Sequence, residues 1–116
     1  MVAGGLPSHL TPGERAALAD FASQVRTLLG ADLHALVLFG SRARGEGNEQ
    51  SDVDVAVVVT PEGRARRREV YDLAFDVHLR HGIDVAPLVV ERGRLAELRA
   101  RERLIARELD RDGIAL

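Results

Sequence analysis

Two aspartates, Asp52 and Asp54, lie at the start of an apolar run that continues to Val59, with one residue between them. Alternate residues of a β-strand point to the same face, so in a strand these two carboxylates would lie side by side. Adjacent carboxylates repel each other, and a shared cation relieves that repulsion. Mg²⁺ prefers such oxygen ligands and is usually held by one or two carboxylates together with phosphate groups. An isolated pair of this type is also typical of two solvated residues at a strand end, so its interpretation needs support from the rest of the chain.

A glycine and a serine, Gly40 and Ser41, end the preceding apolar run, and ten residues separate Ser41 from Asp52. A tight turn of this type presents backbone N–H groups and a hydroxyl to phosphate oxygens, and glycine allows the phosphate to approach closely. Arg42 and Arg44 follow directly and can add charge-assisted hydrogen bonds to a triphosphate. The sequence therefore predicts nucleotide-binding roles for Gly40, Ser41, Arg42 and Arg44.

A third acid, Asp84, opens another apolar run, which continues to Val90. If that strand pairs beside the one with Asp52 and Asp54, alternation places the three carboxylates on one face. Three converging carboxylates suit two-metal phosphoryl transfer, in which one ion activates the attacking hydroxyl and the other steadies the leaving group. We therefore predict catalytic and metal-binding roles for Asp52, Asp54 and Asp84, with Asp84 as a ligand of the activating metal or as the general base.

Short apolar runs predict the strands that carry these residues. The runs at 33–39, 52–59 and 83–90 are rich in Val and Leu and end at Gly, Pro or charged residues, as buried strands do. The polar segment after residue 40 is expected to be mostly loop, with one helical turn after the Gly-Ser pair. A brief terminal strand is expected over 113–116.

Capping signals and helical spacing predict the helices. Thr11, Pro12 and Glu14 form a capping box with proline in the first turn, and apolar residues at helical spacing then continue to residue 29. Thr60 and Pro61 predict the start of a second helix that ends before Gly82, and an apolar stripe predicts a last helix over 95–109. This order of elements predicts an α/β (α+β) fold, with a small mixed β-sheet flanked by helices.

The composition limits what the chain can be. The sequence has 116 residues, 46% of them hydrophobic, which suits a single domain over residues 1–116, with residues 1–10 expected to be flexible. The absence of Cys excludes disulfides and thiolate chemistry, and all 16 basic residues are Arg, which excludes lysine Schiff bases. With 3% aromatic residues and a net charge of -2, direct binding of long nucleic acids is disfavoured.

The sequence also lacks the signals of export or membrane insertion. Its apolar runs are far shorter than the roughly 20 residues that span a bilayer. Its first residues, MVAGGLPSHL, lack the basic start and apolar run of a signal peptide. We therefore expect a cytoplasmic protein without a membrane partner.

The motif as a whole closely resembles the signature of the polymerase-beta nucleotidyltransferase superfamily: Gly40-Ser41, ten intervening residues, Asp52-Val53-Asp54, and the later Asp84. The segments SRARGEGNEQS and VDVAVVV are similar to those of its short prokaryotic branch, the minimal nucleotidyltransferases, and the likeness extends over nearly the whole chain. The resemblance implies a polymerase-beta-like core, ATP as substrate and Mg²⁺, two ions in all, as cofactor. It further implies that Asp52 and Asp54 are Mg²⁺ ligands, that Asp84 is the third acid, and that Gly40-Ser41 is the phosphate-holding turn.

The same resemblance implies a partner. Minimal nucleotidyltransferases are often the antitoxin of a toxin–antitoxin pair whose toxin is a helical HEPN-domain ribonuclease, and some transfer AMP from ATP to a tyrosine of that toxin. Two alternatives remain open: a nucleotidyltransferase that modifies a small-molecule hydroxyl as an oligomer of this chain, and a non-catalytic antitoxin that neutralises its partner by binding alone. The short chain leaves little room for an acceptor-binding domain, which favours an acceptor presented by a docking protein.

Two further features have competing interpretations. The arginine-rich stretches over 64–68 and 92–107 suit either a docking surface or a solvated polar face paired with nearby glutamates. Tyr71, the only tyrosine, is expected to pack against the sheet.

Overall fold

The computed structural model describes residues 6–47, 52–100 and 104–116. Residues 1–5, half of the segment expected to be flexible, lie outside the described residues. Within the remainder of that segment, Leu10 is buried in the core at 4% exposure. Among the described residues, no helix is long and apolar enough to span a membrane.

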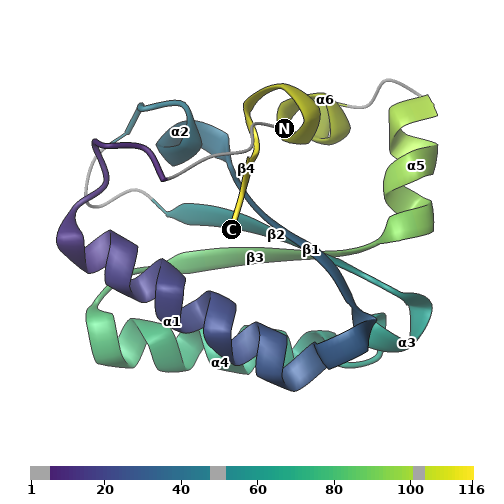
Figure 1. Ribbon diagram of the computed structural model, residues 1–116, viewed down its shortest axis with the longest axis horizontal. Helices are drawn as coiled ribbons and strands as arrows, with labels where there is room; N and C mark the ends of the chain where they lie inside the picture. Colours follow the sequence, from purple (N-terminus) through teal and green to yellow (C-terminus); the bar gives the residue numbers. More distant parts are fainter. Residues whose placement is uncertain (1–5, 48–51, 101–103) are drawn as a thin grey trace.

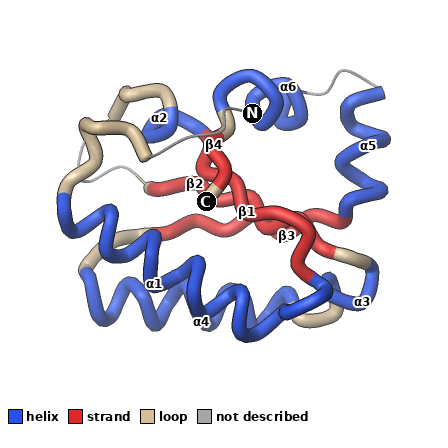
Figure 2. Tube along the Cα trace, viewed as in Figure 1, coloured by secondary structure: helices blue, strands red, loops and turns tan. Residues whose placement is uncertain are grey.

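A four-stranded mixed sheet with the order β3-β2-β1-β4 forms the centre of the molecule (Figures 1 and 2). Strand β1 (Leu33–Phe39) pairs antiparallel with both β2 (Val53–Val59) and the short β4 (Ile114–Ala115). Strand β2 pairs in parallel with β3 (Val85–Glu91), so that Val53 lies opposite Val85. The predicted mixed sheet is confirmed, and the third strand does pair beside the strand that carries the aspartates.

Helices α1 (Pro12–Leu29) and α4 (Arg67–His81) cover one face of the sheet, below it in Figure 1. Phe21 and Val25 of α1 and Val77 of α4 are completely buried in this core. The capping box of α1 is present as predicted: the Thr11 hydroxyl accepts from the Glu14 N–H at 3.0 Å, and a Glu14 carboxylate oxygen accepts from the Thr11 N–H at 3.0 Å.

The opposite face is covered by α5 (Arg92–Ala100) and α6 (Leu104–Asp112). Leu95 of α5 and Leu109 of α6 pack with Val58 and other residues of that face in a second buried cluster. The last predicted helix is therefore two helices on either side of residues 101–103, which lie outside the described residues.

The second predicted helix is also interrupted. Its start at Thr60 is correct, because the Thr60 hydroxyl accepts from the Gly63 N–H at 3.1 Å, but the first part, α3 (Pro61–Arg64), is one turn long. Gly63 lies so close to β2 that an added Cβ would be 2.9 Å from the Cβ of Val59. The chain turns at Ala65 and Arg66 and starts again as α4.

Candidate active site

The Gly-Ser pair begins the single-turn helix α2 (Gly40–Ala43), immediately after β1. Phe39, the last residue of β1, lies opposite Asp54 in the β1–β2 register, so the next residue, Gly40, falls against the Asp54 side chain. Gly40 has a φ of 76°, and an added Cβ would overlap the Oδ2 of Asp54 and lie 3.3 Å from its Cγ. Only glycine allows both this backbone conformation and this close approach. The turn and the carboxylate therefore form one local unit, with the side chain of Ser41 half-buried beside them.

The Asp54 carboxylate lies in an environment that disfavours its negative charge. Burial raises the pKa of Asp54 above its usual value of 3.8, and the charges of Asp52 and Glu108 raise it further, whereas Arg44 has the opposite effect. Asp52 is exposed and Asp54 is half-buried, so an ion between them would reach solvent on one side. Oxygen ligands under mutual repulsion are the chemistry that a divalent cation relieves, so these residues fit Mg²⁺.

Helix α6 brings two further carboxylates near Arg44 at this edge. Arg44 Nη1 lies 3.9 Å from a carboxylate oxygen of Glu108 and 4.0 Å from one of Asp112. Neither acid was among the predicted site residues. The sequence did contain a signal for them. Glu108 directly precedes Leu109 and Asp112 follows it by three residues, and Leu109 packs α6 on the same face of the sheet as Asp54.

The predicted nucleotide contact of Arg42 does not agree with its place in the structure. The Arg42 side chain is buried, and its Nη2 and Nε donate to the two carboxylate oxygens of Glu14 at 2.6 and 2.9 Å. Its Nη1 donates to the Glu46 carbonyl at 3.2 Å. The guanidinium is therefore buried and bound to Glu14 and to the Glu46 carbonyl.

This buried pair ties the start of α1 to the Gly-Ser turn. Burial alone would raise the pKa of Glu14, but the hydrogen bonds from Arg42 and the Thr11 N–H and the charge of Arg42 outweigh it, so the pKa lies below its ordinary value. His9 adds a second connection, because its Nε2 lies 2.6 Å from the Arg42 carbonyl oxygen. Glu14, which sequence analysis recognised as a capping residue, thus also supports the backbone of α2.

Asp84 lies beside Asp52 in the backbone, but its side chain turns another way. The Val53 N–H donates to the Asp84 carbonyl at 2.9 Å, which places the two residues at neighbouring strand starts. The Asp84 carboxylate is 2.7 Å from Nδ1 of His78, on α4. In the described part of the chain, no three carboxylate or histidine side chains are grouped as a metal site would require. Asp84 as the third acid remains a prediction, and in this conformation its carboxylate does not join the other two.

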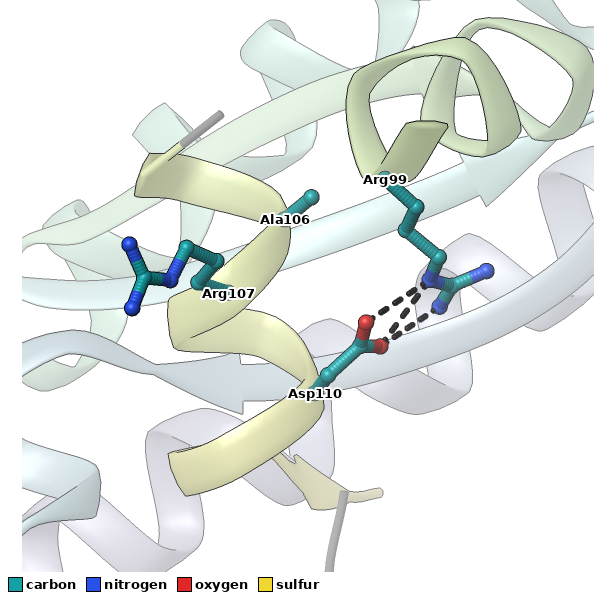
Figure 3. A pocket seen from close by; sticks show the side chains of 4 residues that line it. All are labelled: Arg99, Ala106, Arg107 and Asp110. Carbon is teal, nitrogen blue, oxygen red and sulfur yellow. Dashed lines mark hydrogen bonds and ion pairs between the residues drawn. The ribbon is translucent and has the colours of Figure 1, made fainter. Parts of the chain in front are cut away.

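Three arginines of the arginine-rich stretches, Arg66, Arg94 and Arg99, form ion pairs on the surface. Arg66 binds Glu69 at 2.6 Å and Arg94 binds Glu97 at 3.0 Å, in agreement with the solvated-face alternative. Figure 3 shows a hollow of about 210 Å³ between α5 and α6, where Arg99 reaches across to Asp110 and the Arg107 side chain points away from that pair. This hollow contains none of the predicted site residues.

Known proteins similar to this chain point to the same chemistry as the site. Residues 18–109 match the family model described as nucleotidyltransferase domain. The chain is 38% identical over 77 residues to Putative protein adenylyltransferase MJ1305 of Methanocaldococcus jannaschii, which covers 64% of this chain and 52% of that protein. The chain thus spans about half the length of this relative. The protein named Putative protein adenylyltransferase MJ0141, from the same organism, is 29% identical over 76 residues, or 65% of this chain and 77% of its own length.

Among solved structures, a toxin–antitoxin crystallised with AMP-PNP superposes with a TM-score of 0.51 at 22% identity, over 82% of this chain and 68% of that chain. This likeness concerns the fold. The matched family region includes β1, α2, β2 and β3, and with them every predicted site residue. The chain belongs to the nucleotidyltransferase domain family.

Proposed function

We propose that the protein is a Mg²⁺-dependent nucleotidyltransferase that transfers AMP from ATP to a hydroxyl of a partner protein, a tyrosine of a HEPN-type toxin, and so acts as its antitoxin. The observation that carries the proposal is the contact between the Gly40 turn and Asp54, next to Asp52. It combines, within one hairpin, a backbone turn suited to phosphate with two carboxylates suited to a divalent cation. A cytoplasmic location, where ATP is available, belongs to the same proposal.

In this mechanism, Asp52 and Asp54 hold Mg²⁺, which when bound supplies positive charge that neutralises the phosphates and the developing charge on the oxygens. The Gly40-Ser41 turn positions the triphosphate, and Arg44 faces the same edge. The acceptor oxygen forms a bond to the α-phosphorus while the bond from that phosphorus to the bridging oxygen breaks, and pyrophosphate leaves with the electron pair. The Asp84 carboxylate leaves His78, binds the acceptor hydroxyl and takes its proton.

The relatives support the choice of acceptor class and donor. Two of them bear names that describe protein adenylyltransferases. The solved neighbour is a toxin–antitoxin with AMP-PNP, so ATP and a toxin are the first donor and acceptor to test. The HEPN identity of the toxin and the tyrosine acceptor rest on the sequence resemblance.

The test is incubation with Mg²⁺ and α-labelled ATP, alone and with the protein encoded next to this chain, beside the Asp52→Asn/Asp54→Asn variant. Label on a tyrosine of the partner, lost in the double variant, is the expected result. An unlabelled partner that both forms inhibit equally would instead establish an antitoxin that acts by binding. Label on a small molecule alone would identify a small-molecule nucleotidyltransferase.

A further inference from the structure

The outer face of α4 carries a stripe of large apolar side chains. Tyr71, Phe75 and Leu79 are 38%, 61% and 66% exposed, and each is four residues from the next. Residues at this spacing lie on one side of a helix. Among the described residues, the only other exposed large hydrophobic side chain is Leu104, on α6. Tyr71, which was expected to pack against the sheet, thus belongs to an exposed surface.

The stripe borders a hollow of about 380 Å³ between α4 and the start of the edge strand β3. Phe75 and His78 line it on the helix side, and Asp84 and Pro87 line it on the strand side. The hollow therefore contains the residue that the proposed mechanism assigns to the acceptor hydroxyl. A partner protein bound along α4 would therefore have part of its surface at Asp84.

The charges beside the stripe indicate what covers it. Asp72 and Asp76 are exposed, lie one turn apart on one flank, and form no ion pair with any described residue. Arg68, one turn before Asp72, is also exposed and adjoins this flank. Like charges four residues apart destabilise a helix, and a basic partner opposite Asp72 and Asp76 relieves that repulsion. Two antiparallel copies of α4 related by a two-fold axis would bring the same flank of each helix together, acid against acid.

We propose that this α4 face (Tyr71, Asp72, Phe75, Asp76 and Leu79) is the docking surface for the acceptor protein and takes an amphipathic helix with basic residues along one flank. Apolar anchors of such a helix, at one-turn spacing, match the stripe on α4. Docking there brings a hydroxyl of the acceptor to the hollow at Asp84. The inference rests on the proposed function and names the surface through which that function selects its substrate.

The test measures binding of the protein encoded next to this chain by calorimetry, with ATP binding measured in parallel. The Phe75→Ser/Leu79→Ser variant removes exposed side chains, so the fold is retained, which circular dichroism verifies. We expect its Kd for the partner to rise about tenfold or more, as for interface anchors generally, while its ATP affinity stays unchanged. The matched control is Leu104→Ser, which removes an equally exposed apolar side chain elsewhere and leaves the Kd unchanged. A further variant, Asp72→Arg/Asp76→Arg, is expected to weaken binding as well.

A Kd that stays within twofold of wild type in the Phe75→Ser/Leu79→Ser variant would overturn the proposal, as would a wild-type protein that does not bind the partner. So would a wild-type dimer in sedimentation experiments that this variant dissociates, because a second copy would then cover the face. The proposed function fails separately: if binding depends on the α4 face but no label is transferred, the docking surface stands and the transferase does not. If instead the Phe75→Ser/Leu79→Ser variant still transfers label and its Kd for the partner is unchanged, the transferase stands and the docking surface does not.

Discussion

Replacement of Glu14 by alanine tests the assignment of a buried ion pair that supports the nucleotide-binding turn. The side chains of Glu14 and Arg42 are 1% and 5% exposed and are joined by two hydrogen bonds. The substitution removes the carboxylate and keeps the guanidinium at a buried position. Breaking one partner of a buried pair costs about 3–5 kcal/mol, and loss of the reciprocal helix cap adds about 0.5–1 kcal/mol.

A loss of this size is large for a domain whose total stability is about 5–15 kcal/mol. At roughly 4 °C per kcal/mol, the melting temperature should fall by about 15 °C or more. The matched control is Glu69→Ala, because Glu69 binds Arg66 at 2.6 Å, the same distance as the shorter Glu14–Arg42 bond, but both partners are exposed. We expect little change for this control, because solvent screens exposed pairs.

Urea unfolding of both variants and of the Glu14→Leu/Arg42→Met double variant measures the effect. The double variant should recover much of the lost stability, because apolar replacement of both partners leaves no buried charge. Since the folded pKa of Glu14 lies below its usual value of 4.5, its contribution is complete above that pH and is lost as the pH falls through the folded pKa. A loss below about 1 kcal/mol for Glu14→Ala at pH 7, no more than the cap alone, would refute the assignment.

Three further predictions concern the site and the packing of the helices. Gly40→Ala places a side chain at positive φ, which costs about 1–2 kcal/mol from the backbone alone, and it displaces the Asp54 side chain. Thermal unfolding should show the lower stability, and calorimetry should show a lower affinity for ATP. Burial and neighbouring acids raise the folded pKa of Asp54, so its ionised form destabilises the protein as the pH rises. Asp54→Asn should therefore have a higher melting temperature than wild type at pH 7 without Mg²⁺ or nucleotide, and a lower one would contradict this sign. Hydrogen bonds from His81 and Arg80 lower the pKa of Asp20. Asp20→Asn should therefore lower the free energy of unfolding by about 0.5–1 kcal/mol at neutral pH and leave it unchanged at a pH below the folded pKa. Urea titrations at the two pH values measure the difference.

Local signals in the sequence predicted the elements that position the site. The helix predicted over 12–29 and the strand predicted over 33–39 have the predicted bounds in the structure. Their signals, a capping box and an apolar run between polar or glycine boundaries, act within a few residues, so they can be read from the sequence directly. The single helical turn after Gly40 was predicted in the same way, whereas its contact with Asp54 comes from the β1–β2 register.

Interactions between distant residues were not predictable in this way. Arg42 and Arg44 are the same residue type two positions apart, and composition does not distinguish an arginine that faces a site from one that is buried beneath it. The difference depends on Glu14, which lies 28 residues away in the sequence. The direction of the Asp84 side chain depends similarly on His78, because the register sets its backbone position but a neighbouring helix competes for its carboxylate.

The antiparallel pairing of β1 with β2 has a consequence for folding kinetics. Gly40 and Asp54 face each other across a hairpin, so their contact requires closure of a short chain segment rather than completion of the whole sheet. Contacts of short sequence separation form fast, whereas the parallel β2–β3 pairing must wait for the α3–α4 connection to fold. We expect amide hydrogen exchange during refolding to show protection of β1 and β2 before β3, so that the turn and its carboxylate meet before the fold around them is complete.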